Sequence, residues 1–389
     1  MEPRKVYLDN SATTKVAEEV LNAMTPYFAN EPGNPNSLHQ WGRGARRAVD
    51  EAREDVASLI GADIREIVFT GNGSASDNLA IKGSAWADKK NRKHIITSAV
   101  EHHAVMDTCK WLGKTGYDIT FMPVDEFGMV QPETLKNAIR GDTLLVSVMH
   151  ANNEVGTVNP IEELGSICRE RGVLFHTDAV QTAGHIPIDV SKLPVDMLTI
   201  SAHKMYGPKG TGALYVRRGI KLVPLIHGGG QEYGVRSGTE DTAGIVGFGA
   251  AARLAKRLFE DGEETRVSRL RDKLLDGIIE KIPNSFVTGH RTKRLPFHGS
   301  VCIRQIEGEG ILLRMDYAGI GVSSGSACTS GSLEPSHVLL AMGLDHATAH
   351  GSVRLTLGRE TTEDDIDYVL EKLPPIVEIL RKMSPYKGG

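Results

Sequence analysis

The chain has 389 residues, of which 40% are hydrophobic and 24% charged. This composition is typical of globular proteins and excludes a disordered or fibrous chain, and the length favours two domains. The formal net charge of −4 provides no general attraction for nucleic acid or for an anionic membrane, so neither is expected as a direct partner.

Short β-branched segments alternate with amphipathic segments through the first two thirds of the chain. Apolar residues recur every three or four positions over 45–60, which predicts a helix, and a second helix is expected over 161–171. The alternation predicts an α/β fold with a mostly parallel sheet covered by helices. Ligands bind such sheets at the carboxyl ends of the strands, so candidate residues are sought after each strand. Strands are expected at 66–70, 94–97, 143–150, 173–177 and 196–201.

The last third of the chain begins with charged helical sequence from about residue 241 to residue 282. A second alternation of strands and helices follows and ends in a helix expected over 363–382. We therefore predict a large domain formed by residues 16–258. A smaller α+β domain would be formed by residues 1–15 and 259–389.

Cysteine usage and the first residues indicate the cellular compartment. The four cysteines match neither a disulfide framework nor a paired zinc motif, and this usage suits a reducing cytoplasm. The opening sequence lacks the apolar core of a secretory leader, and no segment reaches the roughly 18 apolar residues of a membrane span. We expect a cytoplasmic protein, and we expect no metal site.

A glycine-rich turn, GNGS at 71–74, follows the strand expected at 66–70. Small residues between a strand and a helix expose amide N–H groups at the helix N-terminus, where a phosphate group binds favourably. The turn lacks the patterns of a P-loop and of a dinucleotide fingerprint. Two interpretations stay open: a phosphate site that includes Gly73 and Ser74, and an ordinary helix cap.

A lysine and an aspartate follow two other strands. Lys204 ends the sequence SAHK, and a lysine in this position can form a Schiff base with a carbonyl cofactor, although most lysines are merely solvated. Asp178 lies in HTDAVQ, where its carboxylate can keep a pyridine nitrogen protonated or can cap a turn. The pair predicts cofactor chemistry more specifically than either residue alone.

Two further strand ends carry polar residues. His102 lies in EHH, and its imidazole can lie flat on a cofactor ring; a zinc site is disfavoured because adjacent histidines point in different directions. Asn153 lies in the polar turn ANNEVG at 151–156. The polar groups of that turn either hydrogen-bond a ligand or cap the turn itself.

A cysteine and an arginine complete the set of candidates. Cys328 is surrounded by glycine and serine, which suits an exposed nucleophile better than core packing, whereas Cys109, Cys168 and Cys302 have apolar or helical neighbours. Arg354 lies within an apolar alternation, where a buried charge needs a partner. A clamp on a substrate carboxylate and a structural salt bridge are both consistent with this position.

Taken together, these residues resemble the NifS/IscS group of cysteine desulfurases. The segment SSGSACTS resembles this group rather than the SufS branch, whose cysteine segment is shorter. One turn departs from the family, because GNGSASDN replaces the common SGATESDN. The matching segments occur in the family's order, and they are YLDNSATT, GNPNSLH, SDNLAIKG, EHHAV, MHANNEVG, HTDAVQ, SAHKMYGPKG, HGGGQEYGVRSGT, SSGSACTSGSLEPSHVL and SVRLTLGR.

The resemblance implies a pyridoxal-phosphate-dependent transferase of fold type I and gives each matched residue a role. Lys204 would form the Schiff base, Asp178 would pair with the ring nitrogen, and His102 would stack on the ring. Cys328 would be the nucleophile and Arg354 would bind the substrate carboxylate. The remaining matches are Asn153 and Gln181 at the ring, Gly73, Ser74, Ser201 and His203 at the phosphate, and Thr239, which would reach the phosphate from the other subunit of a homodimer.

The resemblance also implies the reaction. L-Cysteine would become L-alanine, and its sulfur would remain on Cys328 as a persulfide for an iron–sulfur scaffold protein or another acceptor, such as a tRNA-thiolating enzyme. The alternatives are a selenocysteine lyase, an aminotransferase and a non-catalytic assembly subunit. An aminotransferase needs no loop cysteine, and a non-catalytic subunit needs no Schiff-base lysine.

Overall fold

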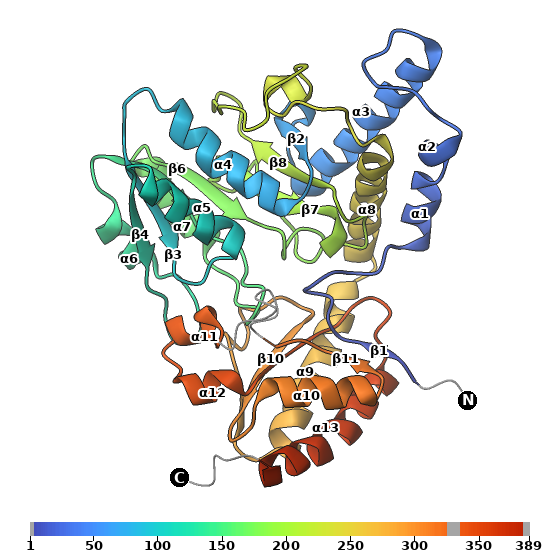
Figure 1. The fold of residues 1–389 in the computed structure, drawn as a ribbon, viewed down its shortest axis with the longest axis vertical. Coiled ribbons are helices and arrows are strands. Elements are labelled where there is room, and N and C mark those ends of the chain that lie inside the picture. The colour runs from blue at the N-terminus through green and yellow to red at the C-terminus, as the bar shows by residue number, and fades with distance from the viewer. Residues whose placement is uncertain (1–3, 325–334, 384–389) are drawn as a thin grey trace.

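A computed structural model describes residues 4–324 and 335–383, which form two units that lie one above the other (Figure 1). The predicted strands and helices are present, with ends that differ by a few residues. The strands are β1 (Val6–Tyr7), β2 (Ile67–Thr70), β3 (His94–Ser98), β4 (Asp118–Met122), β5 (Thr143–Ser147), β6 (Leu174–Asp178), β7 (Met197–Ser201), β8 (Gly212–Val216), β9 (Ser285–Val287), β10 (His298–Ile303), β11 (Ile320–Gly321) and β12 (Ser352–Thr356). The α-helices are α1 (Glu18–Met24), α2 (Pro26–Ala29), α3 (Gln40–Ile60), α4 (Gly73–Ala87), α5 (His103–Lys114), α6 (Pro132–Ala138), α7 (Ile161–Glu170), α8 (Thr242–Glu260), α9 (Glu263–Lys281), α10 (Gly308–Tyr317), α11 (His337–Ala341), α12 (His346–His350) and α13 (Glu363–Met383).

The upper unit is built on a seven-stranded sheet in the order β2-β8-β7-β6-β5-β3-β4. Only β8 runs antiparallel to its neighbours, so the sheet is mostly parallel, as predicted. The register aligns Ser147 with His176 and Asp178 with Thr199. The carboxyl ends of β5, β6 and β7 therefore meet at one edge of the sheet.

Helices cover both faces of this sheet. The helices α4 and α5 pack on one face, and α3, α6, α7 and α8 pack on the other, so each face has its own apolar core. The strands β2, β3, β5 and β7 are buried along their whole length, which explains their continuous β-branched and apolar sequence. The fold is thus α/β with two covering layers.

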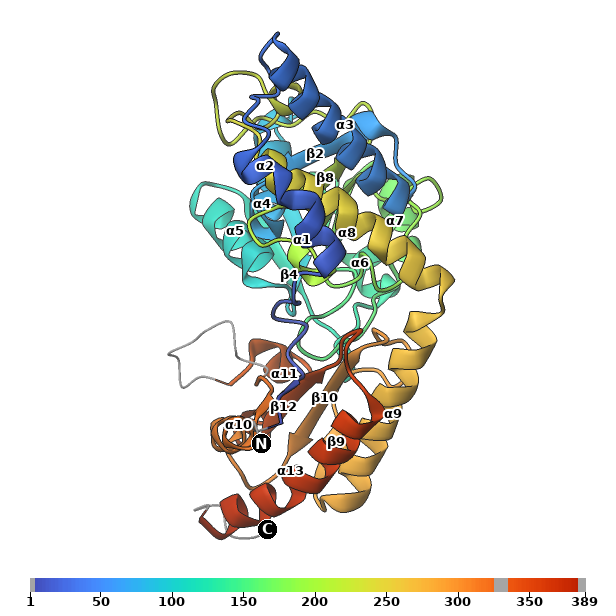
Figure 2. The ribbon, with the colours of Figure 1, turned by 90° about the vertical axis from the view of Figure 1, so that its right-hand side faces the viewer.

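The lower unit contains a three-stranded antiparallel sheet, β12-β10-β9, packed against α9, α10 and α13. The charged sequence of 241–282 forms two helices, α8 and α9, separated near Gly262, whose φ is +71°. These helices run one after the other from the upper unit into the lower one (Figure 2).

The N-terminal segment belongs to the lower unit, because β1 pairs in parallel with β11. Val6 and Leu8 contribute to the apolar core of the lower unit, whereas Ala17 and Val20 contribute to that of the upper unit. These packing clusters support the division that we propose, with residues 16–258 in one domain and residues 1–15 and 259–389 in the other. Among the described residues, no helix is both long and apolar enough to cross a membrane.

Candidate functional site

A cavity of about 300 Å³ lies at the carboxyl edge of the large sheet. Ten of the twelve residues predicted for the site line it, although they come from six separate parts of the chain. Of the other two, Thr239 is exposed and does not line the cavity of its own chain, and Cys328 lies outside the described residues. The ten are Gly73, Ser74, His102, Asn153, Asp178, Gln181, Ser201, His203, Lys204 and Arg354.

The N-terminus of α4 forms one wall of the cavity. Asn72 caps the helix, because its Oδ1 accepts a hydrogen bond from the amide of Ala75 at 2.8 Å. A Cβ atom at Gly73 would lie 2.8 Å from Cγ2 of Val180, so only glycine lets this turn approach the end of β6 so closely. Asn72 therefore caps the helix, and Gly73 and Ser74 line the cavity, where a phosphate site stays a prediction.

Lys204 ends the short 3₁₀ turn Ala202–Lys204 that follows β7. Its Nζ donates hydrogen bonds to the carbonyls of Ser11 and Ala12, the latter at 2.7 Å. Tyr206, two residues later, has a φ of +66°, which is a strained conformation for a non-glycine residue. The chain turns sharply there, and the lysine stays directed into the cavity from the strand end.

Asp178 ends β6, is buried and lines the cavity. Its Oδ1 accepts a hydrogen bond from the amide of Val180 at 2.9 Å, so it also stabilises the turn after the strand. Burial raises the pKa of its carboxyl group, while the nearby charge of Lys204 acts in the opposite direction. A buried carboxylate that faces a cavity in this way favours a ligand with a protonated nitrogen.

His102 and His103 point in different directions, as predicted. His102 lines the cavity, and its Nδ1 accepts a hydrogen bond from the amide of Ala104 at 3.1 Å. Burial and the charge of Lys204 lower the pKa of His102 to about 4, so the ring is neutral at physiological pH. His103 instead pairs with Asp107 at 3.6 Å on the surface of α5. No group of three metal-binding side chains occurs among the described residues.

The two asparagines of the turn after β5 have different roles. Asn152 caps the turn, because its Oδ1 accepts hydrogen bonds from the amides of Glu154 and Val155. Asn153 lines the cavity, and its backbone carbonyl accepts hydrogen bonds from His298 at 3.0 Å and Arg354 at 3.1 Å. The turn therefore fixes one wall of the site and also contacts the lower unit.

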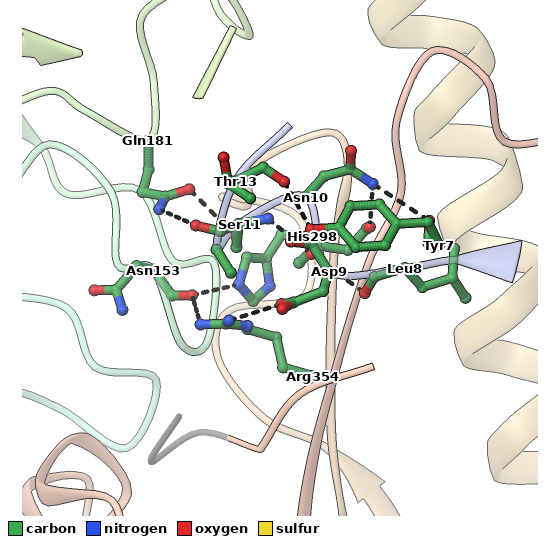
Figure 3. Close-up of polar contacts among 12 residues, drawn as sticks. Tyr7, Leu8, Asp9, Asn10, Ser11, Thr13, Asn153, Gln181, His298 and Arg354 are labelled. Atoms are coloured by element: carbon green, nitrogen blue, oxygen red, sulfur yellow. Dashed lines mark hydrogen bonds and ion pairs between the residues drawn. The ribbon is translucent and has the colours of Figure 1, made fainter. Parts of the chain in front are cut away.

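Arg354 enters the cavity from β12 of the lower unit (Figure 3). Its side chain is only 2% exposed, and its Nη2 lies 2.9 Å from Oδ1 of Asp9. The Nε atom is buried and has no hydrogen-bond partner among the described residues. Arg354 thus forms a structural ion pair and also faces the cavity, so the two sequence interpretations do not exclude each other.

Sequence reasoning missed the contribution of the N-terminal segment to the site. Ser11 and Ala12 line the cavity, and Ser11 holds the amide group of Gln181 from both sides. The hydroxyl of Ser11 donates to Oε1 of Gln181 at 3.2 Å, and the carbonyl of Ser11 accepts from Nε2 at 3.0 Å. Much of this contribution comes from backbone carbonyls, which carry no side-chain signal in the sequence.

Asp77 is a second residue that sequence reasoning missed. It lies one turn into α4, lines the cavity and is 1% exposed, and its Oδ1 has no hydrogen-bond partner among the described residues. Burial and the proximity of Asp178 raise the pKa of its carboxyl group. The available signal was its place one turn after the glycine-rich turn GNGS, at the start of the helix that borders the candidate site.

The cysteines differ in their surroundings. Cys109, Cys168 and Cys302 are buried, and burial raises the pKa of each thiol to about 12, so none is a thiolate at physiological pH. The two flanks of the segment that contains Cys328 lie beside the cavity. Ser323 pairs with the backbone of Arg354, and the hydroxyl of Ser336 donates to Glu154.

Comparisons with known proteins agree along almost the whole chain. Residues 6–369 match the aminotransferase class-V family. The chain is 52% identical over 384 residues to a protein of Methanosarcina thermophila named cysteine desulfurase IscS, covering 99% of this chain and 95% of the relative. A solved structure of a NifS-like protein has a TM-score of 0.91 at 39% identity and covers 97% of this chain and 100% of its own. Another, described as SspA in complex with cysteine, has a TM-score of 0.80 at 37% identity and covers 92% and 100%.

Proposed function

The chain belongs to the aminotransferase class-V family and, within it, to the cysteine desulfurases, and on this premise we propose that its cavity converts L-cysteine into L-alanine. The observation that carries the proposal is the convergence of Lys204, Asp178 and His102 in one cavity that Arg354 also lines. The sulfur would pass to Cys328 and from there to an acceptor protein. An iron–sulfur scaffold protein is the acceptor that we propose first, and the cytoplasm is the compartment.

The residues of the cavity fit pyridoxal phosphate, the cofactor of this family. Gly73 and Ser74 at the N-terminus of α4 would hold the phosphate, with Ser201 and His203 beside them. Asp178 is a buried carboxylate suited to a protonated ring nitrogen, and a cation there would compensate the cost of its burial. When bound, the cofactor supplies a carbonyl group for amines and a protonated ring that accepts electrons.

Side chains of the cavity would bind the substrate and remove its proton. The Nζ atom of Lys204 would take the proton from the Cα atom of the substrate, because it is the amine that lines the cavity. Neutral His102 can lie against a planar ring without repelling a cation there. Arg354 would hold the substrate carboxylate through its guanidinium group, and the neighbouring Asn153 would also contact the substrate.

Cys328 would carry out the sulfur transfer. Its thiolate attacks the sulfur of the substrate, a sulfur–sulfur bond forms, and the carbon–sulfur bond of the substrate breaks. The electron pair of the broken bond stays on the carbon fragment, which takes up a proton and leaves as alanine. Cys328 is four residues beyond Ser324, and four residues span at most about 14 Å. The pairing of Ser323 with Arg354 therefore supports a cysteine within reach of the cavity.

A homodimer would complete the site. Thr239 is exposed on its own chain, which supports its proposed contact with the phosphate in the neighbouring subunit. Leu38 is 91% exposed, and Ile226 and Trp41 are about half exposed. Asn36 and Arg46 both bond Glu240, next to Thr239, so these apolar side chains surround the same region of the surface. A partner subunit that covers them would bring each Thr239 to the other chain.

The test is alanine formation from L-cysteine by the purified, pyridoxal-phosphate-loaded protein with a thiol reductant. We expect catalytic alanine and an equal amount of sulfide. Replacing Lys204 by alanine should lower alanine formation by on the order of a hundredfold or more, because the proton acceptor is lost. Cys328→Ser should bind cofactor and cysteine but form no persulfide.

The matched control is Cys168→Ala, which removes a buried thiol and should keep the activity. A persulfide that still forms in Cys328→Ser would place the nucleophile elsewhere. Alanine from selenocysteine, with none from cysteine, would identify a selenocysteine lyase. Absence of alanine from either substrate despite bound cofactor would contradict the proposed function.

A further inference from the structure

Asp9 supplies the carboxylate that contacts the guanidinium group of Arg354. Arg354 is almost fully buried and also donates from Nη1 to the carbonyl of Asn153 at 3.1 Å. One of its terminal nitrogens is therefore engaged by a negative charge of the protein itself, and the other by a neutral carbonyl (Figure 3). Among its other N–H donors, the one on Nε is buried and has no protein acceptor among the described residues.

Asp9 is held in this place by the backbone on both sides of it. The amide of Thr356 donates to the carbonyl of Leu8 at 2.7 Å, and Nδ2 of Asn10 donates to the carbonyl of Thr356 at 2.8 Å. The hydroxyl of Tyr7 donates to the carbonyl of Asp9 at 3.1 Å. Because Thr356 lies on β12, the same strand as Arg354, the carboxylate and the guanidinium group are fixed to one another.

We propose that Asp9 is a specificity-determining residue that shares Arg354 with the carboxylate of the bound amino acid. This inference rests on the proposed function, in which Arg354 binds that carboxylate. Two carboxylates on one buried guanidinium group repel each other, so Asp9 weakens the binding of every carboxylate ligand. A ligand held by its carboxylate alone is then retained poorly. Selection depends on the amine and the thiol, and alanine, which lacks the thiol, leaves readily.

The experiment measures ligand binding rather than turnover. The probe is 3-mercaptopropionate, which has the carboxylate and thiol of cysteine but no amine to react with the cofactor. Its dissociation constant on the loaded enzyme is determined by calorimetry. Asp9→Asn keeps an oxygen acceptor beside Arg354 but removes the charge, and we expect it to bind the probe three- to tenfold more tightly. The neutral 3-mercaptopropanamide should bind both proteins equally.

Two further variants test whether the loss of charge, rather than a change in the structure of the N-terminal segment, explains the tighter binding of the probe. Asp9→Ser also removes the charge, so the same tightening is expected if Asp9→Asn does not fold. Arg4→Gln is the matched control, because Arg4 binds Asp365 at 2.9 Å and ties the same segment to α13 away from the cavity. It should leave the binding of the probe unchanged. An equal effect of Arg4→Gln would overturn the assignment to the charge of Asp9.

Arg354→Gln separates this inference from the proposed function. If it abolishes binding of the probe while the Asp9 variants bind equally or more weakly than the wild type, the inference about Asp9 is wrong and the carboxylate anchor stands. If Arg354→Gln binds the probe as well as the wild type, Arg354 is not the anchor and that part of the proposed function fails. Tighter binding in the Asp9 variants, lost with Arg354→Gln, supports both.

Discussion

Three buried carboxyl groups lie in or near the cavity wall, and their surroundings differ. Asp178 and Asp77 line the cavity, and Glu101, which precedes His102 in the chain, is fully buried. Glu101 accepts hydrogen bonds from the hydroxyl of Ser98 at 2.5 Å and from the amide of Met149 at 3.0 Å. Despite these bonds, burial raises the pKa of Glu101 to about 8, and the charge of Asp178 adds to the effect.

The raised pKa of Glu101 therefore predicts that the stability of the protein depends on pH. Its pKa is raised in the folded protein, from 4.5 to about 8, so the folded state holds a proton that the unfolded state releases. The contribution of Glu101 to the free energy of unfolding is complete below pH 4.5. It falls by at most about 5 kcal/mol as the pH rises toward 8. Glu101→Gln imitates the neutral acid at every pH. Its thermal midpoint should rise relative to that of the wild type between pH 5 and pH 8.

The control for this measurement is Glu163→Gln, which changes an exposed carboxyl group on α7. Its thermal midpoint should differ from that of the wild type by a similar amount at both pH values. A constant difference between Glu101→Gln and the wild type would show that Glu101 ionises at its ordinary pKa in the folded protein.

At the scale of elements, the sequence predicted those parts of the site that follow buried strands. Lys204 and Asp178 could be found because a chemically distinctive side chain comes after an apolar run, and the sheet then brings the strand ends together. Ser11 and Ala12 could not be found, because their carbonyls reach Lys204 only after β1 has paired with β11 in the lower unit. A hydrogen bond from a side chain to the backbone of a distant segment leaves no local pattern in the sequence of that segment.

One buried ion pair joins three elements of the large unit. Arg53 of α3 forms two bonds of 2.6 Å to Glu232, and Glu232 also accepts a hydrogen bond from the amide of Phe69 in β2 at 2.7 Å. Both side chains are about 3% exposed or less. The pair therefore fixes the 3₁₀ turn Glu232–Gly234, at the start of the segment that leads to Thr239, against the helix and the sheet.

Removing one charge of this pair should lower the free energy of unfolding substantially. Glu232→Gln keeps an acceptor for the amide of Phe69 but leaves the buried charge of Arg53 without its counter-ion, so we expect a loss of about 3 kcal/mol in the free energy of unfolding. Chemical denaturation measures it. The double variant Arg53→Met with Glu232→Gln should be more stable than Glu232→Gln alone, because no buried charge is left unpaired.

Glu360→Gln provides the comparison for an exposed pair. It removes the partner of Lys15, whose side chain is 75% exposed, and should cost less than about 1 kcal/mol. Equal losses for Glu232→Gln and Glu360→Gln would contradict the role assigned to the buried pair.

At the scale of the whole molecule, one chain brings together ten of the twelve predicted site residues in its cavity, and Thr239 is exposed outside that cavity. Sequence patterns could not place Thr239, because its proposed contact depends on a second chain. The apolar side chains around it are the feature that supports a partner. Large apolar side chains gathered on a protein surface are typical of an interaction site.

If a dimer completes the site, a substitution that disrupts the dimer should also weaken the binding of the cofactor. The wild type should sediment at twice the chain mass of 42.2 kDa. Leu38→Asp places a charge on the most exposed of the apolar side chains near Thr239 and should produce monomers, because an unpaired charge is costly in an interface. The monomers should bind pyridoxal phosphate more weakly, by roughly tenfold, since a lost hydrogen bond to a charged group costs about 1.5 kcal/mol or more. Tyr317→Asp changes an equally exposed side chain, on α10 of the lower unit, and as the control it should remain dimeric with normal affinity. A Leu38→Asp protein that stays dimeric would place the interface on another surface, and a monomer with unchanged affinity would remove Thr239 from the phosphate site.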